Sequence, residues 1–74
     1  MKLSSIRSGE ELRISSIRDK HTEEKAIRFG IHTGARLRCI CNIKKGPVIL
    51  GKNNQEIALG RQLAEQITVS RDLG

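Results

Sequence analysis

The sequence predicts a mainly β fold, a small and partly open barrel that carries one or two short helices. Its apolar segments are short, none longer than Val48-Ile49-Leu50, and turn residues separate them. Several segments also alternate between apolar and polar residues, with the period of two that a strand requires. With 74 residues, the chain is expected to form one domain over 1–74 with a single thin core. We expect no deep catalytic cleft in so small a core.

The first strand is expected over Leu12–Ile17. Leu12 and Ile14 share one face, whereas Ile17 is out of phase with them. A bulge or bend near Ser15 and Ser16 accounts for that change of phase.

One helix is expected next, because residues that favour helix ends bracket an apolar segment. Thr22 is the predicted N-cap, and Glu23 follows in the first turn, where the helix dipole favours an anion. Gly30 suits the left-handed position that ends a helix. The expected apolar face consists of Ala26, Ile27 and Phe29.

The clearest strand is predicted over Arg36–Ile43, where the period of two is regular. The predicted inner face carries Leu37, Cys39, Cys41 and Ile43, and the outer face carries Arg36, Arg38, Ile40 and Asn42.

The rest of the chain predicts a hairpin, a helical turn and a closing strand. In order, these are a turn at 44–47, a strand at Val48–Leu50, a tight turn at Asn53-Asn54, a strand at Gln55–Leu59, a helical turn within 60–66 and a strand at Ile67–Val69.

The stretch GPVILGKN at 46–53 resembles a nucleotide-binding loop, but its residues do not suit that role. A phosphate loop wraps backbone N–H groups around phosphate at the start of a helix. Pro47 has no N–H, Val48–Leu50 are strand formers, and Asn53 lacks the hydroxyl that binds magnesium. The match is therefore interpreted as part of a β-hairpin, and no cofactor is expected.

Cys39 and Cys41 are weak candidates for a metal site. A closed zinc site needs four ligands, and only His21 and His32 remain to complete one. Cysteine is often buried for packing alone, so both thiols are interpreted as core residues and no metal is expected. No nucleophile stands in a pattern with a base and an orienting acid, so the sequence predicts no enzyme.

The formal charge is +6, from 14 Lys and Arg against 8 Asp and Glu, which invites a nucleic-acid interpretation. The charges are interleaved, however, and Phe29 is the single aromatic residue on which a base could stack. No specific nucleic acid is therefore expected. Five cations on or beside the predicted second strand and hairpin are instead candidates for a partner-binding patch: Arg36, Arg38, Lys44, Lys45 and Lys52.

Nearly the whole chain resembles the ferrous-iron transport protein A (FeoA) family. Two glycines, Gly30 and Gly34, flank Ile31-His-Thr33, and the segments GPV, IAL and ITV follow in a fixed order. The resemblance rests on Leu3, Gly9, Ile14, Ile17, Ile27-Arg-Phe-Gly-Ile31, Thr33-Gly34-Ala-Arg-Leu37, Gly46-Pro47-Val48, Ile57-Ala-Leu59, Ala64 and Ile67-Thr-Val69. It implies an SH3-like barrel.

The resemblance also implies a cytoplasmic accessory of the membrane iron permease FeoB, which carries a G-protein domain, with membrane contact only through that partner. Gly60 departs from the family pattern, since a basic residue usually follows the IAL segment and Arg61 stands one place later. A similar barrel forms the C-terminal domain of iron-dependent repressors, which becomes the alternative if the chain is a fragment. A small basic RNA-binding barrel is the third hypothesis.

Overall fold

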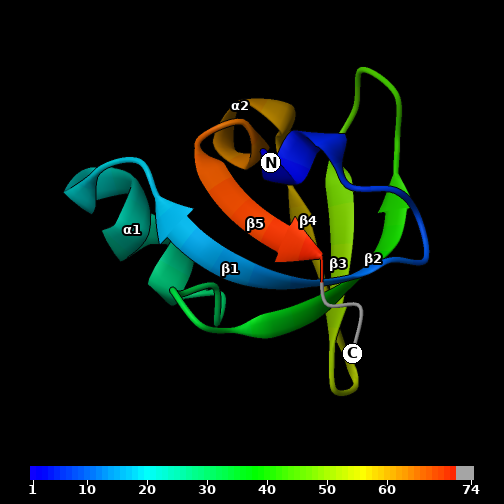
Figure 1. Ribbon diagram of the computed structural model, residues 1–74, viewed down its shortest axis with the longest axis horizontal. Coiled ribbons are helices and arrows are strands. Elements are labelled where there is room, and N and C mark those ends of the chain that lie inside the picture. The colour runs from blue at the N-terminus through cyan, green and yellow to red at the C-terminus, as the bar shows by residue number, and fades with distance from the viewer. Residues whose placement is uncertain (72–74) are drawn as a thin grey trace.

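The computed structural model describes residues 1–71 of the chain, and it confirms a mainly β fold built on one antiparallel sheet (Figure 1). The strands lie in the order β4-β3-β2-β1-β5. Their bounds are β1 Glu11–Ile17, β2 Arg36–Asn42, β3 Val48–Lys52, β4 Gln55–Leu59 and β5 Ile67–Arg71. The helices are the 3-10 turn η1 at Leu3–Ser5, α1 at Lys20–Ile27 and α2 at Arg61–Ala64.

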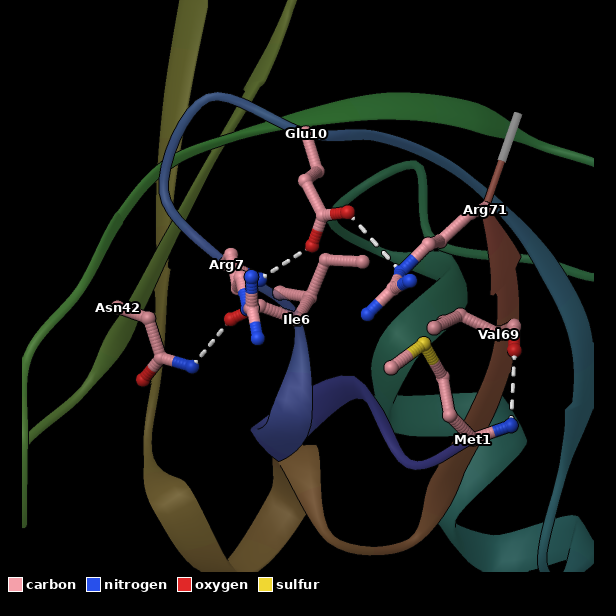
Figure 2. A network of polar contacts seen from close by, with 7 residues as sticks. All are labelled: Met1, Ile6, Arg7, Glu10, Asn42, Val69 and Arg71. Atoms are coloured by element: carbon pink, nitrogen blue, oxygen red, sulfur yellow. Dashed lines mark hydrogen bonds and ion pairs between the residues drawn. The ribbon is translucent and has the colours of Figure 1, made fainter. Parts of the chain in front are cut away.

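The sheet curls into a partly open barrel, and the start of the chain covers its β5 edge. The backbone N–H of Val69 donates to the Met1 carbonyl at 2.7 Å, and the terminal ammonium donates to the Val69 carbonyl at 3.1 Å (Figure 2). Lys2 forms an isolated bridge with Thr68. Next to this edge, η1 packs against α2, where the chain passes from β4 to β5 (Figure 1). These contacts protect an edge that would otherwise be open to another strand.

The core consists mainly of the inward side chains of the strands, joined by Leu3 and Ile6 from the N-terminal segment. The helices and the connection from α1 to β2 add Ala26, Ile31, Ala35 and Ala64. Alternation along each strand places these residues on one face, since successive side chains point to opposite sides. Burying one such aliphatic side chain contributes about 1.5–3 kcal/mol. The strand residues that are fully or nearly fully buried are Leu12, Ile14, Leu37, Cys39, Val48, Leu50, Leu59, Ile67 and Val69.

Two bulges change the register of the sheet. The pairing of β1 with β5 shifts between Ile14 and Ser16, which confirms the predicted bulge. The pairing of β2 with β3 shifts between Cys39 and Cys41, where the sequence alternates without a break. The predicted inner face is therefore wrong beyond Cys39: Cys41 is half-buried and Ile43 is 41% exposed.

The predicted hairpin is confirmed. Val48–Lys52 is strand β3, Asn53 has a left-handed φ of 56°, and Lys52 pairs with Gln55 across the turn. The stretch that resembles a nucleotide-binding loop is thus a strand that enters a two-residue β-turn. No helix among residues 1–71 is long and apolar enough to cross a membrane.

The helix α1 begins earlier than the sequence suggests. Asp19, not Thr22, is its N-cap: the Asp19 carboxylate accepts the Thr22 N–H at 2.8 Å. Thr22 is buried instead, and its hydroxyl donates to the Gln66 side chain at 2.7 Å. The predicted position of Gly30 is correct, since its φ is 78°.

The predicted apolar face of α1 is also wrong for two of its three residues. Ala26 is buried, but Ile27 is 58% exposed and Phe29 is 54% exposed. The helix lies at one end of β1 and covers little of the sheet, so one narrow side of it is enclosed (Figure 1). Phe29 lies beyond the last helical residue, in the turn that leads to Gly30.

Asp19 should make the stability of the folded chain depend on pH in the acidic range. The hydrogen bond from the Thr22 N–H lowers the pKa of this carboxyl below its ordinary value. The carboxylate therefore stabilises the folded chain above the ordinary pKa, and this contribution is lost as pH falls through the lowered value. We expect Asp19→Asn, which can still cap the helix, to remove that part of the acid dependence. Asp19→Ala should lower stability at neutral pH as well. Urea unfolding at several pH values measures the free energy of unfolding of both variants. Identical pH profiles for Asp19→Asn and the parent would contradict the role of the Asp19 carboxylate as the N-cap.

Candidate functional site: two basic hollows

The first hollow, which we call the sheet hollow, lies on the outer face of β2, β3 and β4 and measures about 550 Å³. Glu11, Arg38, Gly51 and Glu56 pair across four neighbouring strands and form one row along it. Gly51 leaves a gap in this row, because it has no side chain. A Cβ atom at Gly51 would lie 2.9 Å from Cδ1 of Ile40, so any larger residue there would push the end of the Ile40 side chain aside.

Three of the five predicted partner-binding cations line the sheet hollow: Arg36, Arg38 and Lys52. Lys52 also reaches across to the turn after α1, where its ammonium group donates to the Gly30 carbonyl at 3.4 Å. The carboxylates of Glu11 and Glu56 line the same hollow. The sheet hollow is therefore basic overall but carries charges of both signs.

The second hollow, which we call the loop hollow, measures about 430 Å³ and lies between the N-terminal segment and the β2–β3 connection. It contains the other two predicted cations, Lys44 and Lys45. Its lining residues are Ser4, Ser5, Ile6, Arg7, Ser8, Asn42, Lys44, Lys45 and Arg61. The β2–β3 connection and the β3–β4 hairpin project from opposite ends of β3 (Figure 1), so the structure divides the five cations between two places.

Arg61 and Asn42 both line the loop hollow, and we call this pair its floor. Local sequence patterns predict neither role. The Arg61 guanidinium donates to the carbonyls of Gly46, Ile43 and Ser4 at 2.9, 2.6 and 3.2 Å. It also donates to the Asn42 side-chain oxygen at 2.6 Å. Arg61 thus connects three segments that are far apart in the sequence.

Asn42, predicted to point outward, is turned toward the N-terminal segment. Its side-chain amide donates to the Ser4 carbonyl at 3.0 Å. It also donates to the Ile6 carbonyl at 2.6 Å (Figure 2). Its backbone N–H donates to the Ser8 hydroxyl at 3.0 Å. These bonds are possible because the bulge in β2 ends the regular alternation just before Asn42.

Glu10 holds the end of the same N-terminal segment in place. Its carboxylate accepts the Arg7 N–H at 2.8 Å and forms an ion pair with Arg71 at 2.9 Å (Figure 2). The segment that leads from η1 into β1 is thus held on both sides, by Asn42 and by Arg71.

Within the part of the chain that the structure describes, the two cysteines belong to no group of three or more potential metal ligands. Cys39 is fully buried and Cys41 half-buried, and both are free thiols. Burial, with a smaller contribution from Cys41, raises the pKa of the Cys39 thiol, which disfavours the thiolate that binds metal. Within residues 1–71, no group of three or more His, Cys, Asp or Glu side chains is placed to hold a metal ion.

We expect the double substitution of Cys39 and Cys41 by alanine to cost about 1–3 kcal/mol of unfolding free energy and to leave metal content unchanged. The loss should come mainly from Cys39, since the single variant Cys41→Ala changes a half-buried position. Chemical unfolding and elemental analysis of tag-free protein measure both quantities. Near one zinc or iron per chain in the parent, removed by the double substitution, would refute this interpretation.

The fold and its surface define the class of protein: a small SH3-like barrel with two basic hollows on its surface, one on the outer face of the sheet and one beside the N-terminal segment. The family model described as the FeoA domain matches residues 1–71. The chain belongs to the FeoA family.

Solved structures agree with this assignment. An iron uptake regulatory protein (FeoA) superposes with a TM-score of 0.88 at 24% identity, and the alignment covers 96% of each chain. The FeoA protein of Chlorobium tepidum has a TM-score of 0.82 at 25% identity, over 100% of this chain and 71% of that one. A manganese-dependent transcriptional repressor also shares the fold, with a TM-score of 0.83 at 21% identity, but this chain covers 41% of it. No curated protein matches the chain.

Proposed function

We propose that this chain is a cytoplasmic, non-enzymatic accessory of ferrous-iron uptake, a single domain that binds the cytosolic part of the membrane iron permease FeoB. The match of the FeoA family model to residues 1–71 carries the proposal. The surface supports it, since cations line two separate hollows while metal-binding clusters are absent from residues 1–71. A basic surface speeds encounter with an acidic partner and is screened beyond about 8 Å at physiological salt.

The direct test is a binding titration of the purified chain against the purified cytosolic part of the permease. We expect saturable binding that weakens as salt is raised, because charge contributes to the encounter. The repressor domain of similar fold is a control of similar shape, and it should not bind. Absence of binding at low salt would count against the proposal.

The repressor hypothesis remains the second candidate, because the same barrel occurs within a manganese-dependent repressor. In such a setting the barrel would act on the rest of its own chain rather than on a membrane protein. Failure to bind the permease, together with binding to a separately expressed DNA-binding domain, would favour this candidate.

RNA binding is expected to be weak. The outer face has charge but lacks stacking platforms, since Phe29 is the sole aromatic residue of the chain. We therefore expect affinity for single-stranded RNA to be independent of sequence and lost at physiological salt, as for contacts made to phosphate alone. Filter binding at two salt concentrations measures this. A sub-micromolar, sequence-dependent affinity at physiological salt would contradict it.

A further inference from the structure

The loop hollow carries positive charge that nothing within residues 1–71 neutralises. Arg7, Lys44, Lys45 and Arg61 all line it, and none of the four forms an ion pair within those residues. No carboxylate lines it either, whereas Glu11 and Glu56 line the sheet hollow. The nearest acid to Arg7 along the chain, Glu10, is held by Arg71. Four like charges around one depression repel one another, so an anion placed among them would be stabilised.

The same hollow offers hydroxyl groups and a fixed floor. Ser4, Ser5 and Ser8 line it, and the Ser8 oxygen accepts the Asn42 N–H, so its own hydrogen remains available to a ligand. Four hydrogen bonds fix the Arg61 guanidinium in position, so its charge needs no rearrangement when an anion binds. Lysine ammonium groups supply further donors from the turn at 44–45.

The residue types in the lining also indicate which chemical groups of a ligand fit the loop hollow. Aromatic side chains are absent from it, and Ile6, its one aliphatic residue, is 1% exposed. No aromatic ring there can stack on a base, and no exposed aliphatic residue there can hold an acyl chain. A volume of about 430 Å³ admits a phosphate or pyrophosphate group with room for water.

We propose that the loop hollow binds a multiply charged phosphate group, held by the Lys44 and Lys45 ammonium groups, the Arg7 side chain and the Ser8 hydroxyl over the fixed charge of Arg61. This site is separate from the stretch that resembles a nucleotide-binding loop, whose residues 48–52 form β3. The proposal does not depend on binding to the permease, and its test uses the isolated chain.

The first arm of the test is thermal unfolding with pyrophosphate as the probe, against sodium chloride at equal ionic strength. At ten times the dissociation constant, pyrophosphate should raise Tm by roughly 6 to 11 °C. Lys44→Gln/Lys45→Gln should lose most of this shift. The control Lys20→Gln/Lys25→Gln removes two exposed cations from α1 and changes net charge equally, and it should retain the shift.

The second arm distinguishes a soluble phosphate from one carried by a lipid headgroup. Vesicles of phosphatidylcholine with and without phosphatidylglycerol are sedimented with the parent and both variants. Binding to the anionic vesicles that depends on Lys44 and Lys45 assigns the phosphate to a membrane surface, and a pyrophosphate shift without vesicle binding assigns it to a soluble ligand. Binding in neither arm, or binding that the Lys44→Gln/Lys45→Gln variant retains in full, would overturn the proposal.

Discussion

Replacing Arg61 with methionine is expected to remove about 2–4 kcal/mol from the free energy of unfolding. The aliphatic stem is largely retained, but the four hydrogen bonds from the guanidinium are lost. Hydrogen bonds that involve a charged group contribute about 1.5–3 kcal/mol each. The total loss should be smaller than the sum of four such bonds, because Arg61 is only half-buried and water can hydrogen-bond to the carbonyl groups that lose their donor. Since small domains are stable by roughly 5 kcal/mol, this single change should bring the chain close to unfolding at ordinary temperatures.

Two further variants make this prediction specific to hydrogen-bond geometry. Arg61→Lys keeps the charge but not the planar fork, so about half of the loss should remain. Arg28→Met changes an exposed arginine at the end of α1 and should cost less than about 0.5 kcal/mol. Urea unfolding, monitored by circular dichroism, measures the free energy of unfolding of all three variants. If Arg61→Met costs no more than Arg28→Met, the connecting role of Arg61 is wrong.

Reversing charge at Arg36, Arg38 and Lys45 together is expected to weaken binding to the cytosolic part of the permease by about tenfold or more. All three side chains are exposed, so the fold should be kept. This variant alters both hollows, since Arg36 and Arg38 line the sheet hollow and Lys45 lines the loop hollow. A titration with the folded variant measures the change.

Paired reversals then show which hollow faces the partner. Arg36→Glu/Arg38→Glu alters only the sheet hollow, and Lys44→Glu/Lys45→Glu only the loop hollow. Lys20→Glu/Lys25→Glu on α1 is the matched control and should bind as the parent does. If the triple variant binds normally, neither hollow is the interface, and the exposed Ile27 and Phe29 become the next candidates.

Local patterns were sufficient to predict most of the fold. The phase change at Ile17 indicated the bulge in β1, and the Asn53-Asn54 turn indicated the hairpin, because both effects arise between neighbouring residues. The bulge in β2 could not be predicted this way. Its alternation is regular through Cys41, and the shift appears only when β2 pairs with β3.

The floor of the loop hollow could not be predicted, because it depends on contacts between distant segments. Arg61 donates to Ser4, which is 57 residues away, and Thr22 donates to Gln66, which is 44 residues away. Asp and Thr are both common N-cap residues, so the sequence alone does not decide between Asp19 and Thr22. The contact between Thr22 and Gln66 occupies the Thr22 hydroxyl and leaves Asp19 as the cap. The candidate cations could be chosen from the sequence. Their division between two hollows could not, because it arises from the two connections of β3, which project from opposite ends of that strand.

Ferrous-iron uptake by living cells measures whether this chain assists the permease. Cells that lack this chain but keep the permease are given labelled ferrous iron, and the parent chain or the triple variant Arg36→Glu/Arg38→Glu/Lys45→Glu is supplied from a plasmid. We expect low uptake without the chain, restoration by the parent, and little restoration by the variant at equal protein level. Uptake that is unchanged by loss of the chain, or fully restored by a variant that no longer binds the permease, would contradict the proposed function.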